Sequence, residues 1–283
     1  MIQTIDKRLS DELSGHTRSL SVKRFFQSMG YERSGELPLI VSRLEPDFHR
    51  PLRLLDIGSG DSVLPTFLLK KTAWDITCLD KFSWVQKQHE FARRVMDGRD
   101  YSSRFHVVEQ DLLESDFPAE SYDLITNISV IEHFDGMSDG EAMKRSAALL
   151  RPGGRYILTT LMNGARFREF FLNQNIYGEE FSGKSVFFQR HYDVPSFEER
   201  VLKPSGLHEM ERTYFGDYGF QFAETFMDMP WPWKPVKALY QWATPVFARR
   251  FLTYRDYPFG NPAMRMFTAS GVFVVLEKPP CVE

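Results

Sequence analysis

The sequence predicts an α/β protein with a doubly wound, mostly parallel sheet, and two observations carry this prediction. From Leu52 onward, short apolar runs of strand length alternate with stretches of helical periodicity, which is typical of βαβ units. The runs are almost continuously apolar, as in strands that helices cover on both faces. We therefore expect strands at 53–57, 75–79, 105–109, 122–127 and 155–160.

Two helices are expected between these strands. In the stretch 82–97, Val85, Ala92 and Met96 share one face at helical spacing. The second helix, 138–150, ends in Arg-Pro-Gly-Gly, a stop followed by a tight turn. Upstream, residues 1–50 are predicted to form an N-terminal helical segment, with the main domain spanning 51–283.

After residue 161 the alternation breaks down, and two further strands are expected at 207–215 and 271–279. The remaining parts, about 161–204 and 216–266, are interpreted as insertions that form a helical and aromatic substrate cap. They are longer than ordinary connections between secondary-structure elements.

The stretch Met229–Arg255 is the most unusual part of these insertions, because it combines tryptophans with basic residues and has no acidic residue. A lid, a dimer contact and a membrane contact all fit this composition, and we favour the lid. Its prolines argue against one long helix.

The composition excludes some classes of function. The chain has 283 residues and a net charge of −3, whereas proteins that bind nucleic acid usually have a basic excess. Cys78 and Cys281 form neither a disulfide framework nor a metal-binding spacing. With no signal-peptide pattern and no apolar run long enough to cross a bilayer, we expect a cytoplasmic protein with a small-molecule substrate and no metal. The oligomeric state stays open.

A glycine-rich turn follows the first predicted strand, in the stretch Leu-Leu-Asp-Ile-Gly-Ser-Gly-Asp-Ser (54–62). Gly58 and Gly60 permit a tight turn and let a ligand approach bare backbone. A helix starting near Ser62 would point its N-terminal amides at that ligand. A turn that needs glycine for purely structural reasons is the competing interpretation.

Carboxylates follow the next two predicted strands. Asp80 comes twenty positions after Gly60, a spacing that suits a carboxylate accepting hydrogen bonds from ribose hydroxyls. Asp111 follows the third strand, where it could accept a hydrogen bond from an adenine amino group. Either aspartate could instead cap a helix. Because parallel strands end at the same edge of a sheet, their joint occurrence favours one ligand site.

In this order and at these spacings, DIGSGDS, CLD, EQDL, YDLITNISVIEHF and LLRPGG resemble the class I S-adenosylmethionine-dependent methyltransferases. The resemblance covers residues 50–160 and implies a Rossmann-like, seven-stranded sheet whose last strand is antiparallel. It implies S-adenosylmethionine as the cofactor. It also implies cofactor-binding residues at these positions: Asp56, Gly58 and Gly60 for the methionine part, Asp80 for the ribose, Asp111 and Leu112 for the adenine, and Asn127, Ile128 and Ser129 for the floor near the methionine end. Ser59 and Lys81, next to these residues, are also expected to bind the cofactor. Ser62 departs from the family, which often has a third glycine there.

Two other functions remain possible on the sequence. An NAD-dependent oxidoreductase also combines a glycine-rich turn with a downstream acidic residue, but Val63 occupies its third glycine position and Asp111 would have no role. A protein that keeps the fold and binds a cofactor or partner without catalysis is the second alternative.

The expected reaction is methyl transfer to a hydroxyl or amine of a small molecule, such as an apolar, lipid-like or sugar-containing metabolite. A base would help to deprotonate a hydroxyl acceptor. His133, just past the fourth strand, is the first candidate, and His191 is the second. Candidate substrate contacts are Arg190, Tyr192, Trp231 and Trp233.

Overall fold

The computed structural model describes the chain except residues 1–2, 163–165, 174–184, 219–233, 257–266 and 281–283. Within the described residues, a nine-stranded sheet runs through the molecule in the order β1-β10-β9-β11-β6-β5-β2-β3-β4. The strands of this sheet are β1 (Gln3–Thr4), β2 (Arg53–Ile57), β3 (Asp75–Asp80), β4 (Phe105–Glu109), β5 (Tyr122–Ile128), β6 (Leu150–Leu161), β9 (His208–Tyr218), β10 (Leu252–Arg255) and β11 (Phe267–Glu277). A separate hairpin pairs β7 (Arg168–Leu172) with β8 (Val186–His191).

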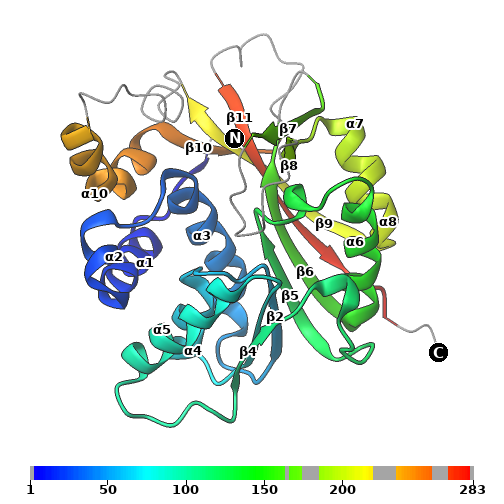
Figure 1. Cartoon of the computed structure of the whole chain (residues 1–283), viewed down its shortest axis with the longest axis horizontal. Helices are drawn as coiled ribbons and strands as arrows, with labels where there is room; N and C mark the ends of the chain where they lie inside the picture. The colour runs from blue at the N-terminus through cyan, green and yellow to red at the C-terminus, as the bar shows by residue number, and fades with distance from the viewer. Residues whose placement is uncertain (1–2, 163–165, 174–184, 219–233, 257–266, 281–283) are drawn as a thin grey trace.

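Helices cover both faces of the large sheet (Figure 1). One layer contains α1 (Lys7–Leu20), α2 (Val22–Gln27), α3 (Tyr31–Leu44), α4 (Leu64–Lys71), α5 (Lys87–Met96) and α10 (Lys234–Phe251). The other layer contains α6 (Ser138–Leu149), α7 (Val194–Phe197), the π-helical turn η5 (Glu198–Leu202) and α8 (Lys203–Ser205). Short 3₁₀ turns complete the chain: η1 (Glu45–Asp47), η2 (Ser83–Gln86), η3 (Leu112–Glu114) and η4 (Ile131–His133). None of the helices that the structure describes is long and apolar enough to cross a membrane.

Successive residues of one strand pack into two different hydrophobic cores, one on each face of the sheet. Leu54 packs into the core under the first helical layer, and the next residue, Leu55, packs into the core under the second. Both are fully buried. Successive side chains of a strand point to opposite faces, so a strand covered on both sides must be apolar at every position. This explains the continuous apolar runs in the sequence.

The five strands predicted from apolar runs are all present, and their pairing is parallel from β4 through β3, β2 and β5 to β6. The expected antiparallel last strand is β11, which pairs antiparallel with β6 and with β9. The predicted seven strands form the core. The sheet differs from the prediction by two strands, β10 and β1, which extend it beyond β9.

The N-terminal segment and the second insertion are joined to the sheet edge. β1 pairs with β10, and the Tyr254 hydroxyl donates a hydrogen bond to the Gly35 carbonyl of α3. One expectation was wrong here: α10 is a single helix of 18 residues despite an internal proline, Pro245. Pro235 lies in the first turn, where no intrahelical N–H is needed, so only Pro245 removes a helical hydrogen bond.

Candidate functional site

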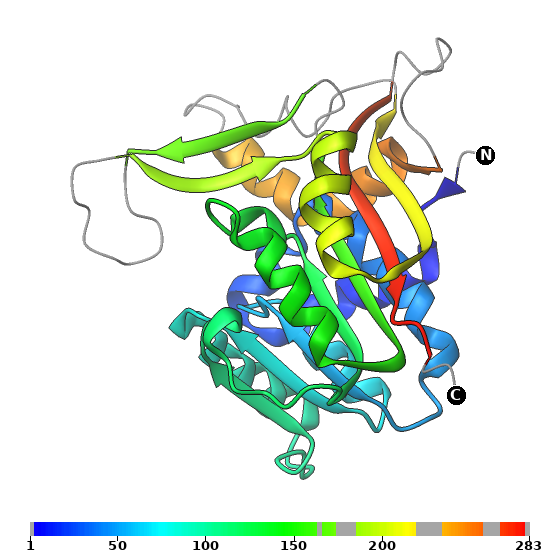
Figure 2. The same ribbon diagram turned by 90° about the vertical axis from the view of Figure 1, so that its right-hand side faces the viewer.

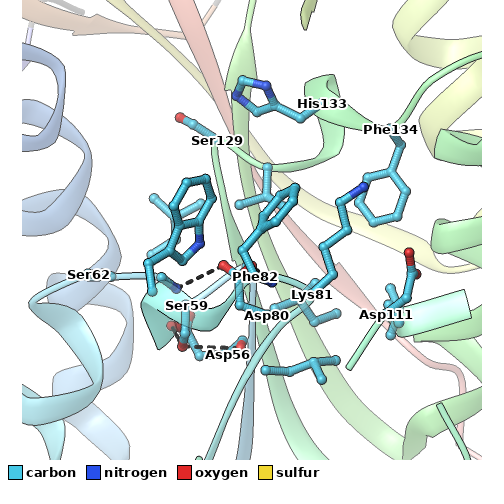
Figure 3. Close-up of a pocket in the computed structure, with 18 of the residues that line it drawn as sticks. Asp56, Ser59, Ser62, Asp80, Lys81, Phe82, Asp111, Ser129, His133 and Phe134 are labelled. Atoms are coloured by element: carbon cyan, nitrogen blue, oxygen red, sulfur yellow. Dashed lines mark hydrogen bonds between the residues drawn. The ribbon is translucent and has the colours of Figure 1, made fainter. Parts of the chain in front are cut away.

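A cavity of about 820 Å³ lies at the carboxyl ends of β2, β3 and β5. β2 pairs with both β3 and β5, so the sheet order reverses here, which is where open α/β sheets bind ligands. Figure 3 shows polar side chains from successive strand ends converging on this space, with His133 and Ser129 on one side and Asp111 on another.

The glycine-rich turn after β2 forms the floor of the cavity. Gly58 has a φ of +67° and Gly60 a φ of +44°, a region that side chains rarely adopt. A Cβ atom at Gly58 would lie 2.3 Å from a methyl carbon of Val130, so this position excludes any side chain. α4 begins at Leu64, two residues later than the sequence predicted.

Asp56, the last polar residue of β2, is held by two hydroxyl groups. The Ser59 hydroxyl donates to Oδ2 at 2.5 Å and the Thr126 hydroxyl donates to Oδ1 at 2.5 Å. The carboxyl is only 2% exposed, and burial raises its pKa to about 6. Asp56 therefore ties the loop after β2 to the neighbouring strand β5 while lining the cavity.

Asp80, at the end of β3, connects two loops through their backbone. Its Oδ2 accepts from the Gly60 amide at 3.0 Å and its Oδ1 accepts from the Phe82 amide at 2.9 Å. Burial raises its pKa, although these amide hydrogen bonds oppose the shift. The carboxylate lines the cavity, as does Lys81, whose ammonium group lies 5.0 Å from the centre of the Phe82 ring.

Asp111 caps a turn and also lines the cavity, whereas its contact with adenine stays a prediction. Its Oδ1 caps the turn η3 by accepting from the Leu113 amide at 2.9 Å, and the residue also lines the cavity. Leu112, next to it, is buried and lines the same wall. A capping role and a ligand-facing position coincide at one carboxylate.

The end of β5 is divided between cavity and core. Ile128 and Ser129 line the cavity, with Ser129 in the left-handed region at φ +50°. Asn127 differs from the expectation. It is fully buried and absent from the lining, and its Oδ1 accepts from the Ile131 amide at 3.1 Å. Asn127 thus fixes the turn η4, which carries His133.

The sequence reasoning missed Arg33, a cavity residue supplied by α3. Its Nη1 donates to the Ser129 hydroxyl at 3.0 Å and pairs with the buried Glu36 at 2.5 Å. The Ser129 hydroxyl in turn donates to Glu36 at 2.7 Å. The Arg33 side chain remains 41% exposed, so a cation lies in the cavity wall. Only an i,i+3 Arg–Glu spacing marked it in the sequence.

His133 lines the cavity from η4. Its Nδ1 lies 2.8 Å from the carbonyl oxygen of Phe188, which can only accept, so Nδ1 carries the hydrogen and the neutral ring has its lone pair at Nε2. Burial lowers the pKa of His133. The β7–β8 hairpin, which extends away from the sheet in Figure 2, therefore orients this imidazole while Val186, Phe187 and Phe188 line the cavity beside it.

Three other predicted residues, His191, Arg190 and Tyr192, lie outside the cavity lining. His191 is half-buried on β8, with its ring 4.6 Å from that of Phe170. Arg190 and Tyr192 are fully buried and bind Asp139, at 2.7 Å through Nη1 and 2.9 Å through the phenolic hydroxyl. They anchor the hairpin instead of facing a ligand. Trp231 and Trp233 lie outside the described residues.

A family model described as a methyltransferase domain matches residues 29–199, which is more than half of the chain and includes Arg33 and the hairpin. None of the curated proteins compared with the chain matched it in sequence.

Solved structures share the fold at low identity. An S-adenosylmethionine-dependent methyltransferase from Methanosarcina mazei matches with a TM-score of 0.53 at 11% identity, covering 84% of this chain and 97% of that one. Phosphoethanolamine N-methyltransferase 2 from Haemonchus contortus matches with 0.52 at 16%, covering 88% and 53%. The [4+2]-cyclase SpnF matches with 0.50 at 15%, covering 87% and 83%. At these identities the likeness concerns the fold.

Proposed function

Because the chain belongs to the class I S-adenosylmethionine-dependent methyltransferases, we propose that it methylates a hydroxyl or amine on a small acceptor with an apolar body. One observation carries this proposal. The cavity that holds the glycine loop, Asp80 and Asp111 continues to His133 and the apolar side chains of β8, so one space offers a cofactor site and an acceptor site.

The cofactor-facing residues fit S-adenosylmethionine, which supplies an activated methyl group when bound. Gly58 and Gly60 leave backbone bare where a side chain would fill the space. Asp80 is oriented by two amides, so it is ready to accept hydrogen bonds from ribose hydroxyls without reorganisation. Leu112 offers an apolar surface for the adenine, and Asp111 an acceptor for its amino group.

Arg33 is the residue that we assign to the cofactor's carboxylate. It lines the same cavity as the glycine loop and His133. Glu36 and the Ser129 hydroxyl fix its guanidinium group. A pre-oriented arginine binds a carboxylate with little loss of side-chain entropy.

His133 is proposed as the base that accepts the acceptor's proton at Nε2. Its low pKa keeps the ring neutral at pH 7, and the hydrogen bond to the Phe188 carbonyl fixes the tautomer. Phe134 and Phe187 flank the space beside it and would pack on the body of the acceptor. A hydroxyl acceptor benefits most from such a base.

Calorimetric titration with S-adenosylhomocysteine tests the cofactor site, with NAD as the comparison ligand. We expect micromolar binding of S-adenosylhomocysteine that is lost in Asp80→Ala and kept in Asp100→Ala, a control at an exposed aspartate. Binding of NAD in place of S-adenosylhomocysteine would overturn the proposal in favour of the oxidoreductase alternative.

Transfer from labelled S-adenosylmethionine to a panel of apolar alcohols, phenols and amines tests the acceptor class. His133→Asn keeps a donor toward the Phe188 carbonyl but removes Nε2, whereas His133→Ala removes both. We expect both variants to lose about 10²–10⁴-fold in kcat on a hydroxyl acceptor. A His133→Asn enzyme as active as the wild type would show that the imidazole only shapes the cavity. Tight cofactor binding without transfer to any acceptor in the panel would contradict the proposed acceptor class.

A further inference from the structure

Two neighbouring helices far from the mechanism expose large apolar side chains. On α2, Val22 is 70% exposed, Phe25 52% and Phe26 64%. On α10, Trp242 is 45% and Val246 56% exposed. α2 and α10 pack against each other and lie side by side at the left edge of Figure 1. We call these five side chains the α2–α10 face. They do not line the cavity.

The exposed apolar side chains of the α2–α10 face are clustered. Five of the eleven large hydrophobic side chains that are exposed in the described part of the chain gather on these two helices. Single exposed apolar residues are ordinary, but a cluster of aromatic and aliphatic side chains marks an interaction surface. The five side chains are each between 45% and 70% exposed, so they present apolar surface to the solvent.

The charges around the α2–α10 face are almost all positive. α2 and residues 241–251 of α10 contain Lys23, Arg24, Arg249 and Arg250 and no acidic residue. The guanidinium group of Arg18 lies 5.0 Å from the Trp242 ring centre.

Two of these cations are neutralised by neighbouring carboxylates. Asp61 pairs with Arg24 at 2.8 Å, and Asp11 pairs with Arg249. Lys23 and Arg250 have no ion pair among the residues that the structure describes. The face therefore keeps a net positive charge beside its apolar side chains.

We propose that the α2–α10 face binds reversibly to the surface of an anionic lipid bilayer. Phenylalanine and tryptophan side chains enter the interfacial region of a bilayer, and flanking lysines and arginines are attracted to acidic headgroups. A second copy of the chain fits the face less well. A symmetric contact would bring together two faces of the same net positive charge, which repel each other.

The position of α2 connects this surface to the cavity. Arg24 of α2 donates a hydrogen bond to the Asp61 carbonyl at 2.7 Å, and Asp61 lines the cavity. When the protein is bound to a membrane through the α2–α10 face, the part of the cavity lined by Asp61 would lie near the membrane surface. The surface proposal rests on exposure and charge alone, so it stands independently of the acceptor assignment.

Co-sedimentation with vesicles tests the proposal. We expect the wild-type protein to pellet with vesicles of equal parts phosphatidylcholine and phosphatidylglycerol, and at least tenfold less with phosphatidylcholine alone, since each basic residue near an anionic surface strengthens binding several-fold. Phe25→Ser with Phe26→Ser, and Lys23→Glu with Arg250→Glu, should each reduce the bound fraction about tenfold or more.

Matched control variants separate this effect from general changes in the protein. Met210→Ser removes a 56% exposed apolar side chain from β9, and Lys144→Glu reverses a charge on α6, on the opposite side of the molecule in Figure 1. Both should pellet like the wild type. Circular dichroism melting checks that every variant is folded, and S-adenosylhomocysteine titration checks that the cavity is intact. A wild-type protein that stays in the supernatant overturns the proposal. So does dimerisation in analytical ultracentrifugation that Phe25→Ser with Phe26→Ser abolishes, because the face would then serve self-association.

Discussion

The two walls of the cavity are built in different ways. The core wall consists of consecutive strand ends, and backbone amides hold its carboxylates: Gly60 and Phe82 for Asp80, and Leu113 for Asp111. The outer wall comes from α3, which precedes the core strands in the chain, and from the β7–β8 hairpin, which follows them. Ion pairs with buried carboxylates hold it in place, Arg33 with Glu36 and Arg190 with Asp139.

This difference predicts whether a substitution in each wall lowers stability or ligand affinity. A carboxylate held by backbone amides keeps its position when neighbouring side chains change, so substitutions in the core wall act by removing a ligand-facing group or by filling the space beside the backbone. A buried ion pair leaves an uncompensated charge when one partner is removed. We therefore expect substitutions in the outer wall to lower stability and substitutions in the core wall to lower ligand affinity.

Asp139→Ala should have the largest effect, because both Arg190 and Arg200 bind this fully buried carboxylate. Removing it leaves the buried Arg190 without its main counter-charge, which costs about 3–5 kcal/mol. Urea unfolding measures the loss. Glu199→Ala, which breaks an exposed pair with Lys203, is the control and should change stability by about 0.5 kcal/mol or less. A loss below about 1 kcal/mol in Asp139→Ala would refute the anchoring role.

Gly58→Ala tests the core wall. The methyl group would collide with Val130 and enter the cavity floor, so we expect affinity for S-adenosylhomocysteine to fall about 100-fold, or about 2.7 kcal/mol. Gly98→Ala is a matched control, since Gly98 also has a positive φ, +78°, but nothing lies near its Cβ position. It should share the backbone strain and keep the affinity. Equal affinities in the two variants would refute a close approach at Gly58.

Glu132, in the turn η4, should make the stability of the protein depend on pH. It is fully buried beside His133, accepts from the Thr160 hydroxyl at 2.9 Å, and burial raises its pKa from 4.5 to about 8. Between these pH values the folded protein holds a proton that the unfolded chain has lost, so stability falls as pH rises from 4.5 to 8 and then levels off.

Glu132→Gln should remove this slope, which in the wild type amounts to about 3 kcal/mol of stability between about pH 5.5 and pH 8.5. Urea unfolding at pH 5.5 and pH 8.5 measures it. Glu199→Gln, at an exposed glutamate, should keep the wild-type slope. Parallel pH curves for the wild type and Glu132→Gln would mean that Glu132 is ionised in the folded protein.

Arg33→Ala should have the smallest effect of the substitutions proposed here. Arg33 belongs to the outer wall, but we assign it to the cofactor, so its substitution should lower ligand affinity. We expect S-adenosylhomocysteine to bind about tenfold more weakly, or about 1.4 kcal/mol, with partial recovery in Arg33→Lys. Lys87→Ala removes another cation of the cavity lining and should change affinity less than about threefold. Equal losses for Arg33→Ala and Lys87→Ala would indicate a general charge effect.

The core wall could be predicted from the sequence because its signals are local. Gly58 and Asp80 directly follow predicted strands and Asp111 comes two residues after one, and parallel strands bring their ends together once the fold class is known. Asn127 shows the limit of this reasoning, since a residue at the right strand end turned inward to fix η4. Side-chain direction at a strand end depends on the loop that follows, which the pattern does not specify.

The outer wall could not be predicted in the same way. Arg190 and Tyr192 were candidate substrate contacts because they flank the candidate base His191, but their partner Asp139 is more than fifty residues away in sequence. Arg33 was missed because nothing near it in the chain reveals that α3 packs beside the end of β5. Partners that meet only through packing leave no mark at fixed spacing.

The sequence by itself therefore determined the alternation of strands and helices, the glycine turn and the carboxylates that follow the strands, because each depends on neighbours in the chain. Only the tertiary structure decided which polar side chains face the cavity and which are buried in ion pairs. It also decided that α2 and α10, more than 200 residues apart, form one apolar and basic surface. These outcomes depend on contacts between distant segments, whose geometry is fixed when the whole sheet and its two helical layers pack together.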